Sequence, residues 1–465
     1  MTKEQLLYRL APYGQEHLVA FWDELDQHGR QTLARQIWQI DLGLVDRLFR
    51  RGDRRCDYGA MAARSQPPPA IRLPPANNPF GKEEAIKRGK QALSSGQVGA
   101  ILVAGGQGTR LGFPHPKGMF PIGPLSKRSL FQIHVEKLRA TAARYGKSIP
   151  LYLMTSPATH DESVAFFAEH QRFGLPEDEL FIFCQGTMPA VDAVSGRILL
   201  AAREQIALSP DGHGGMLAAI VRSGGLEHMR QRGVELLFYF QVDNPLVEIC
   251  SPEFLGYHLL SGSEMTTQVV AKQNPLDQVG NVVQIDGKLH VIEYSELPDE
   301  QAHRRTADGT LAIWAGSIAV HAFQRSFLER MAEMAEALPF HVARKKVPYV
   351  DAAGNRVEPA QPNALKFERF IFDLMPYAAK AIVVEIDPAE GFAPLKHGSG
   401  DGYGTAAWVQ QCMMAQHRRW LRQAGAEVAS DVPVEISPLF ALDADELAAK
   451  IAAGTRITQP TYFCQ

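Results

Sequence analysis

With 465 residues, the chain is long enough for more than one domain, and 45% hydrophobic and 21% charged residues are ordinary for a soluble globular protein. A net charge of −3 gives no overall basic surface for nucleic acid, so a polyanionic ligand would need a local basic site. The five cysteines are scattered, which argues against a disulfide scaffold and a zinc site. The sequence shows no apolar run of about 18 residues and no signal-peptide core, which argues against a membrane anchor and favours the cytoplasm.

The first 80 residues carry no evident chemistry. Apolar residues recur at three-to-four spacing over residues 3–50, which predicts helices whose role is packing or association. Residues 51–80 are rich in Arg and Pro and predict a linker or an extended strap. The arginines of RRGDRR are expected to form a solvated face.

From residue 100 to about 340, short apolar segments alternate with helical patterns. This alternation predicts an α/β fold with a mostly parallel sheet covered by helices, in which ligands bind at the carboxyl ends of the strands. The predicted strands are Ala100–Ala104, Ile149–Thr155, Leu180–Cys184, Leu236–Val242, Thr266–Ala271, Val282–Ile285 and Leu311–Ile318. The predicted helices are 82–96, Leu130–Arg144, His160–His170, Met216–Arg222, Pro252–Leu260, His321–Leu338, 406–424 and 443–453, with a strand-like piece at 432–442.

The chain is organised around the stretch AILVAGGQGTRLGFPHPKGMFPIGP. Gly105, Gly106 and Gly108 directly follow its apolar strand, and they let the backbone turn sharply and approach a ligand. Consecutive N–H groups in such a loop can bind an anion, and Arg110 and Lys117 add two cations that suit phosphate oxygens. The stretch therefore predicts a strand followed by a basic phosphate loop.

Two common nucleotide motifs do not fit this stretch. No Gly-Lys-Ser/Thr follows, which excludes a Walker A loop, and Leu111 stands where the dinucleotide fingerprint needs a third Gly or Ala, which disfavours a nicotinamide dehydrogenase. The glycines alone are also compatible with a tight turn between buried elements, and the two cations favour phosphate.

GGQGTRLGFPHPKG resembles the signature loop of the UDP-sugar pyrophosphorylases, most closely those of the eukaryotic UDP-N-acetylglucosamine type, and further similar stretches follow over about residues 10–430. The resemblance implies a nucleotidyltransferase (GT-A-like) fold, that is, a Rossmann-type mixed sheet flanked by helices. We expect a helical N-terminal region with a proline-rich strap (1–75), a catalytic domain (76–392) and a small C-terminal α+β region (393–465).

Four positions map to nucleotide or sugar contacts by this resemblance. Gln185, in CQGTMPAVD, carries the donor and the acceptor that a uracil edge requires, although such a residue before Gly is also a common turn residue. Gly212, in SPDGHGG, maps to a uridine contact. His213 stands where the family usually has a sugar-contacting Asn, and an exposed loop histidine is the alternative. Lys366, on a helix predicted within NALKFERFIFDLMPYA, maps to a nucleotide contact.

Asp243 ends the buried strand of FYFQVDNPL. An aspartate at a strand end is well placed to hold Mg²⁺ together with substrate phosphates, although Asp-Asn-Pro is also a good turn starter. Lys396, in FAPLKHGSGDG, maps to a phosphate contact.

The sugar side is expected around a hairpin that turns at Asp286-Gly287. Glu293 and Tyr294 map to sugar contacts, with a surface strand position as the alternative for Glu293. In WAGSIAVHAF, Ser317 and Trp314 both replace a family Asn, and a shorter hydroxyl and a bulky aromatic would alter the sugar pocket.

Together these features imply a uridylyltransferase that makes UDP-sugar and pyrophosphate from UTP and a hexose 1-phosphate, with Mg²⁺ as cofactor and no nucleic-acid or membrane partner. N-acetylglucosamine 1-phosphate is the expected sugar; glucose, galactose or a broad range are the alternatives, as is a non-catalytic nucleotide-sugar-binding protein. We expect a monomer or a weak homo-oligomer. The expected site comprises a catalytic set (Arg110, Lys117, Lys396), a UTP-binding set (Val103, Ala104, Gly105, Gly106, Lys117, Gln185, Gly212, Asp243, Lys366), a sugar-phosphate-binding set (His213, Glu293, Tyr294, Ser317, Lys396) and a metal ligand (Asp243).

Overall fold

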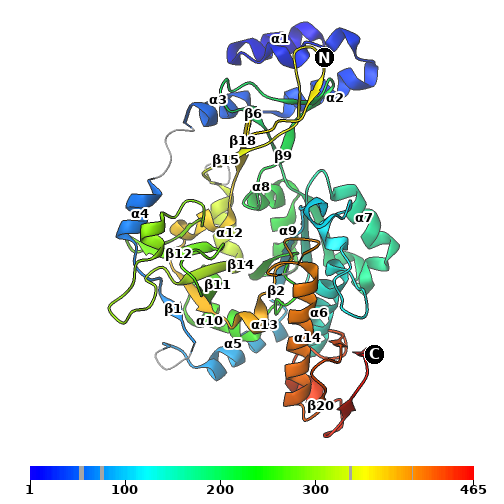
Figure 1. The fold of residues 1–465 in the computed structure, drawn as a ribbon, viewed down its shortest axis with the longest axis vertical. Coiled ribbons are helices and arrows are strands. Elements are labelled where there is room, and N and C mark those ends of the chain that lie inside the picture. Colours follow the sequence, from blue (N-terminus) through cyan, green and yellow to red (C-terminus); the bar gives the residue numbers. More distant parts are fainter. Residues whose placement is uncertain (52–56, 74–77, 335–337, 401, 465) are drawn as a thin grey trace. The chain divides into compact units, whose positions relative to one another are not determined.

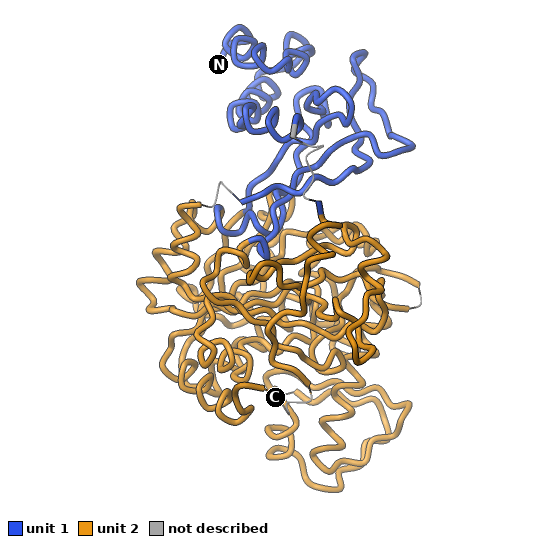
Figure 2. The backbone as a smooth tube through the Cα atoms, turned by 90° about the vertical axis from the view of Figure 1, so that its left-hand side faces the viewer, with its two compact units in different colours: residues 1–57, 185–218, 336–373 blue, residues 58–184, 219–335, 374–465 orange. Residues whose placement is uncertain are grey.

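The computed structural model describes residues 1–51, 57–73, 78–334, 338–400 and 402–464. The chain forms two compact units, which Figure 2 colours separately. The smaller unit contains residues 1–57, 185–218 and 336–373, and the larger unit contains 58–184, 219–335 and 374–465. Each unit thus joins segments that are distant in the sequence, whereas the division at residues 75 and 392 is linear and stays a prediction.

The larger unit is built on a ten-stranded mixed sheet flanked by helices, with strand order β1-β19-β11-β14-β10-β2-β3-β4 (Figure 1). Strand β14 runs antiparallel to both of its neighbours, and the other pairs along this order are parallel. A hairpin of two further strands pairs with β14. The strands are β1 (Ala70–Ile71), β2 (Val98–Val103), β3 (Leu151–Thr155), β4 (Leu180–Cys184), β10 (Leu236–Gln241), β11 (Met265–Ala271), β12 (Gly280–Ile285), β13 (Lys288–Ile292), β14 (Ala315–Gln324) and β19 (Ala381–Glu385).

Strand β2 lies in the interior of this sheet, and every one of its residues is buried. It pairs in parallel with β10 on one side and β3 on the other, and Val103 is opposite Gln241. Parallel pairing brings the carboxyl ends of β2 and β10 to the same edge of the sheet. The predicted strand before the glycine-rich loop is therefore confirmed, and its end adjoins the segment that carries Asp243.

Helices cover both faces of the sheet, as the alternating pattern predicts. They include α5 (Lys82–Ser94), α6 (Leu130–Tyr145), α7 (His160–Glu169), α10 (Pro252–Leu260), α12 (Arg325–Ala332) and α14 (Ala406–Gln423). The C-terminal lobe, residues 421–463, has its own small core and contains β20 (Glu427–Val428), β21 (Val434–Ile436), α15 (Ala444–Ala448), β22 (Arg456–Ile457) and β23 (Thr461–Phe463).

The smaller unit packs the N-terminal helices α1 (Lys3–Leu10), α2 (Gln27–Gln39) and α3 (Leu42–Arg51) against short strands in one hydrophobic core. Its three-stranded sheet has the order β15-β18-β6, with β15 (His341–Lys345), β18 (Ala364–Glu368) and β6 (Val191–Asp192). The predicted helices in residues 3–50 are confirmed. The described part of the strap contains a helix, α4 (Tyr58–Arg64), before the edge strand β1, so it is not extended throughout. Most of RRGDRR lies outside the described residues.

Two predicted helices differ from the structure. The apolar run from His321 belongs to strand β14 as far as Gln324, because Met265–Thr267 of β11 pair with it. Among the described residues of the predicted helix, Arg325–Ala332 are helical, so its core is confirmed and its start is wrong. The predicted helix that carries Lys366 is strand β18, because β15 pairs with it residue by residue. A short run of apolar residues fits both the helical and the strand period, and the presence of a pairing strand decides which structure forms.

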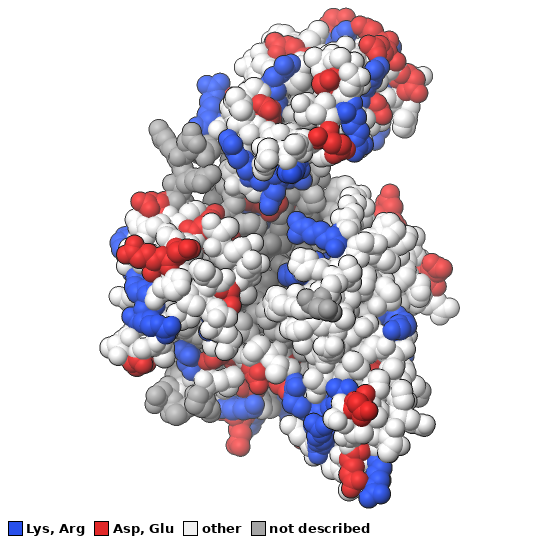
Figure 3. Space-filling model, in the orientation of Figure 1, with Lys and Arg blue, Asp and Glu red and all other residues white. Residues whose placement is uncertain are grey.

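No described helix is long and apolar enough to cross a membrane. On the face in Figure 3, Lys and Arg side chains are interspersed with Asp and Glu, in line with the small net charge.

Helices α5 and α10 cross with their backbones in contact, because each carries a glycine at the crossing point. A Cβ on Gly89 would lie 1.8 Å from the Pro252 carbonyl oxygen, and a Cβ on Gly256 would lie 1.8 Å from the Ala85 carbonyl oxygen. Close packing of this kind leaves no space for even one methyl group.

We therefore expect Gly89→Ala to lower the free energy of unfolding by about 1–3 kcal/mol, even though alanine is the better helix former. Thermal unfolding measures the change, and Lys90→Ala, at an exposed position of the same helix, is the control. Equal melting temperatures for Gly89→Ala and the wild type would contradict this account of the crossing.

Candidate active site

The glycine-rich loop after β2 is closed by its own backbone. Lys117 N–H donates to the Gly106 carbonyl at 3.0 Å, and Gly108 N–H donates to the His115 carbonyl at 2.8 Å. Gly108 must be glycine, because a Cβ there would lie 2.7 Å from the Phe113 carbonyl oxygen. A Cβ on Gly106 would meet nothing within 4 Å, so the space beside this backbone is open to a ligand.

The strand end that enters the loop is anchored to β3 and to the turn after it. Ala104 N–H donates to the Met154 carbonyl at 2.8 Å, and Ser156 Oγ–H donates to the Gly105 carbonyl at 2.7 Å. Val103 is 9% exposed, so the strand is buried up to the point where the glycines begin.

A single carboxylate joins the two lysines that the sequence places far apart. Asp243 Oδ2 accepts from Lys396 Nζ at 2.8 Å and lies 3.7 Å from Lys117 Nζ. Lys117 Nζ also donates to the Leu395 carbonyl at 2.9 Å. These side chains come from the loop after β2, the end of β10 and the segment before α14.

The backbone around this cluster is held by Asn244. Its Nδ2–H donates to the Gly391 carbonyl at 2.8 Å, and its Oδ1 accepts Ala393 N–H at 3.0 Å. Leu395 N–H donates to the Asp243 carbonyl at 2.8 Å. Asn244 is 4% exposed. Its two hydrogen bonds hold the segment that carries Lys396 against the end of β10.

Burial and charge act together on this cluster. Burial lowers the pKa of Lys117, although the Asp243 carboxylate opposes that change. The Asp243 carboxylate raises the pKa of Lys396. Burial would raise the pKa of Asp243, but Lys396 and Lys117 outweigh it and the net pKa is lowered. The positive charge of Arg110 adds to the lowering of the Lys117 pKa and opposes the rise of the Lys396 pKa, so Arg110 is within electrostatic reach of both lysines. The cluster therefore has an excess of positive charge at neutral pH.

The sugar-side residues of the larger unit converge around Gly280, on the hairpin of β12 and β13. A Cβ on Gly280 would lie 3.4 Å from Glu293 Oε1 and 3.8 Å from Ser317 Cβ. The two-residue turn of this hairpin is confirmed, because Asp286 and Gly287 have φ of 50° and 78° between the paired residues Ile285 and Lys288.

Tyr294 and Trp314 differ in their exposure. Tyr294 is 47% exposed and lies within electrostatic reach of Lys396. Trp314 is 7% exposed, and the Arg72 guanidinium lies 3.6 Å from its ring centroid. Trp314 directly precedes strand β14, and Ser317 lies within that strand. The expected effect of Trp314 on the sugar pocket stays a prediction.

The remaining predicted residues belong to the smaller unit. Gln185 is buried, and Lys366 lies on β18. Gly212 has φ of 86°, and a Cβ there would lie 2.3 Å from the Arg369 carbonyl oxygen, so glycine is required.

His213 is packed rather than free in a loop. Its ring stacks on Phe370 with centroids 5.1 Å apart, and its Nδ1 accepts Ile371 N–H at 3.2 Å. Burial, with the charge of His341, lowers the pKa of His213 to about 4. The ring is therefore neutral at pH 7 with its proton on Nε2, which gives one N–H donor.

The tertiary structure thus brings Arg110, Lys117, Asp243 and Lys396 together, with Tyr294 nearby. Gln185, Gly212, His213 and Lys366 lie in the other unit. Sequence reasoning missed Asn244, although its place directly after Asp243 at a strand end was the available signal. It also missed the Leu395 carbonyl, because a backbone acceptor has no sequence signature. The described residues contain no group of three or more His, Cys, Asp or Glu that could hold a metal.

The chain matches the family model described as UTP–glucose-1-phosphate uridylyltransferase over residues 68–458. It belongs to this family. A human relative, UDP-N-acetylhexosamine pyrophosphorylase-like protein 1, is 36% identical over 439 residues, which cover 91% of this chain and 86% of the relative. The UDP-N-acetylglucosamine pyrophosphorylase of Saccharomyces cerevisiae is 36% identical over 389 residues, covering 81% of this chain and 82% of the relative.

Solved structures agree on the fold. The uridine diphosphate N-acetylglucosamine pyrophosphorylase from Trypanosoma brucei, solved with an inhibitor, aligns with a TM-score of 0.81 and 25% identity, covering 97% of this chain and 95% of the other. UDP-glucose phosphorylase from the same organism, at 18% identity and a TM-score of 0.54, covers 66% of this chain and 64% of its own and shares the fold alone. The predicted nucleotidyltransferase fold and family are therefore confirmed.

Because the pKa of Asp243 is lowered in the folded state, the free energy of unfolding is expected to depend on pH. A carboxyl whose folded pKa lies below its unfolded value of about 4 stabilises the fold above that value, and this contribution is lost as the pH falls through the folded pKa. We expect Asp243→Asn to lower the free energy of unfolding at pH 7 by about 1–2 kcal/mol, a modest value because the Lys396 side chain is 50% exposed.

Thermal unfolding between pH 7 and pH 3 tests this, and the difference between Asp243→Asn and the wild type should shrink below about pH 4. Asp431→Asn, at an exposed position, is the control. A difference that stays constant over the whole range would contradict the assigned pKa direction.

Proposed function

We propose that this protein is a uridylyltransferase that converts UTP and N-acetylglucosamine 1-phosphate into UDP-N-acetylglucosamine and pyrophosphate. The observation that carries the proposal is the pairing of Lys117 and Lys396 with Asp243 beside an open, glycine-rich backbone. Membership of a uridylyltransferase family and relatives named for UDP-N-acetylglucosamine support the substrates. We expect it to act in the cytoplasm as a monomer or a weak homo-oligomer.

The reaction needs positioned charge rather than a protein nucleophile. A phosphate oxygen of the sugar 1-phosphate attacks the α-phosphorus of UTP in line, a new P–O bond forms, and the bond from the α-phosphorus to the bridging oxygen breaks as pyrophosphate leaves. Arg110 and Lys117 would neutralise the triphosphate and the leaving group, and Lys396 would hold the incoming phosphate. Catalysis of this kind rests on positioning and on charge stabilisation in a water-poor site.

Asp243 also fits the cofactor that we propose, Mg²⁺. This ion prefers oxygen ligands and is commonly held by one or two carboxylates together with substrate phosphates. One nearly buried carboxylate beside a phosphate-binding loop matches that requirement, with the phosphates as the remaining ligands. When bound, Mg²⁺ would neutralise phosphate charge beside Asp243, and Lys117 and Lys396 would supply further positive charge to the phosphates.

We expect Lys117→Ala to lower kcat/KM for UTP by about 10²-fold or more, because the lost cation faces charge that develops on the leaving pyrophosphate. Pyrophosphate release measures the effect, and Lys147→Ala, at an exposed position, is the control for the loss of one charge. Near-normal turnover would remove Lys117 from the site. UDP-sugar binding by calorimetry without any pyrophosphate formed, in the wild type, would favour a non-catalytic binding protein instead.

Ser317 and His213 leave a second candidate, a wider sugar range, because they replace amides that the family resemblance places at the sugar. Ser317 is shorter than Asn, and neutral His213 offers a single donor. Pyrophosphate release from UTP with N-acetylglucosamine, N-acetylgalactosamine, glucose and galactose 1-phosphates decides between a narrow and a wide sugar range. We expect the N-acetylated sugars to have the highest kcat/KM, and Ser317→Asn to sharpen that preference; equal values for glucose 1-phosphate would assign the broad range.

A further inference from the structure

The segment that follows Lys117 is a closed loop. Phe120 N–H donates to the Lys117 carbonyl at 3.0 Å, and the N–H groups of Ile122 and Gly123 both donate to the Arg128 carbonyl at 3.0 Å. These bonds make residues 120–129 one turn that starts directly after Lys117. Through Phe120, this turn is hydrogen-bonded to the backbone that presents the lysine.

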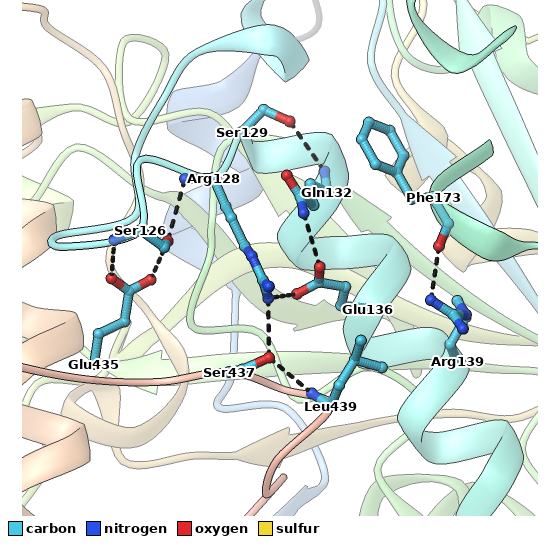
Figure 4. A network of polar contacts seen from close by, with 10 residues as sticks. All are labelled: Ser126, Arg128, Ser129, Gln132, Glu136, Arg139, Phe173, Glu435, Ser437 and Leu439. Carbon is cyan, nitrogen blue, oxygen red and sulfur yellow. Dashed lines mark hydrogen bonds and ion pairs between the residues drawn. The ribbon is translucent and has the colours of Figure 1, made fainter. Parts of the chain in front are cut away.

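Glu435 of the C-terminal lobe holds the tip of this loop (Figure 4). Its Oε2 accepts the N–H groups of Leu125 and Ser126, both at 2.7 Å, and its Oε1 accepts the Ser126 hydroxyl at 2.6 Å. Glu435 is 3% exposed. The fit is tight, because a Cβ on Gly123 would lie 2.9 Å from Glu435 Oε1.

A second contact lies next to the first and joins the same parts. The Arg128 guanidinium pairs with Glu136 of α6 and donates to Ser437 Oγ at 2.9 Å. Gln132 Nε2–H donates to the other oxygen of Glu136 at 2.9 Å. Figure 4 shows these side chains converging between α6 and the C-terminal segment. The loop is thus fastened to the C-terminal lobe at its tip and near its base.

The opposite side of β21 is fastened to α14. Side chains alternate along a strand, so Glu435 points to the loop while Val434 and Ile436 enter the core that also contains Leu421 of α14. His417 Nδ1 accepts Ile436 N–H at 3.3 Å, which adds a polar contact between the same two elements.

The other end of α14 carries the second lysine. The N–H groups of Lys396 and His397 donate to the Gly404 carbonyl at 2.7 and 2.9 Å. Thr405 follows as the helix N-cap, and its hydroxyl accepts Trp408 N–H at 3.3 Å. Helix α14 therefore runs from the Lys396 segment to the lobe that grips the loop after Lys117.

We infer that Glu435 is a positioning residue for the phosphate-binding site, because it ties the Lys117 loop to the rigid unit of β21 and α14 that carries Lys396. The expected effect on kcat/KM rests on the proposed function, whereas the expected effect on the position of the loop rests on the contacts alone. Glu435 touches no substrate; it sets the position of Lys117 relative to Lys396 and Asp243. An active site is sensitive to displacements of about 1 Å, which can cost about 10²-fold in rate.

The test compares two substitutions of one residue. Glu435→Ala removes all three contacts and should lower kcat/KM for UTP by roughly 10-fold to 10²-fold. Glu435→Gln should stay within about 3-fold of the wild type, because its amide oxygen can accept both N–H groups and its NH₂ can donate to Ser126 Oγ. Glu427→Ala is the matched control, since Glu427 lies in the same lobe, is exposed, and its carboxylate pairs with Arg456 of that lobe.

Hydrogen exchange distinguishes a local role of Glu435 in positioning the loop from a general effect on the stability of the fold. In folded Glu435→Ala, hydrogen exchange of the amides at 117–128 should become faster, while the exchange of β2 and β10 stays as in the wild type. Wild-type kcat/KM per folded molecule, or unchanged exchange at 117–128, would overturn the inference. If the wild type released no pyrophosphate from any sugar 1-phosphate, the proposed function would fail, and the exchange experiment would still decide the role of Glu435.

Discussion

One buried carboxylate between two ammonium groups is the interaction on which the candidate site depends. Asp243 accepts from Lys396 and attracts Lys117, and without it the two lysines and Arg110 would repel one another. The arrangement keeps the cations ordered and ready in the absence of a ligand. Phosphate oxygens are also anionic acceptors, and they can take the place of the Asp243 carboxylate as partners of the two lysines.

The sheet makes this arrangement possible. Parallel pairing of β2 and β10 brings the glycine-rich loop and Asp243 to one edge, and Asn244 ties the Lys396 segment to the same place. Neither loop could hold its lysine alone, since a long side chain on a mobile segment loses much of its free energy of interaction to conformational entropy. The packing of the C-terminal lobe through Glu435 extends the same support to the loop after Lys117.

The smaller unit contributes a different kind of group. His213 is held by a stacked ring and a backbone N–H, and its burial keeps it neutral with one defined donor. A neutral, fixed N–H donor suits an uncharged hydroxyl or carbonyl rather than a phosphate.

Much of the fold was predictable from the sequence, because local patterns carry it. The strand before the glycines, the turn at Asp286-Gly287 and the helix after Ser129 each follow from hydrophobic period, turn chemistry or capping. The two wrongly predicted segments, from His321 and around Lys366, contain apolar residues that fit either period. Their conformation is set by a partner strand, which no local pattern identifies.

For the site, the sequence alone determined which residue types are available: glycines free of Cβ, two lysines, an arginine and an aspartate at a strand end. It could not determine that Asp243 would balance both lysines, that Leu395 would offer its carbonyl, or that Arg72 would lie against the Trp314 ring. Those outcomes depend on distances between segments far apart in the chain. Only the tertiary structure decides them, because electrostatic and hydrogen-bonding free energies act over a few ångströms of space and not along the sequence.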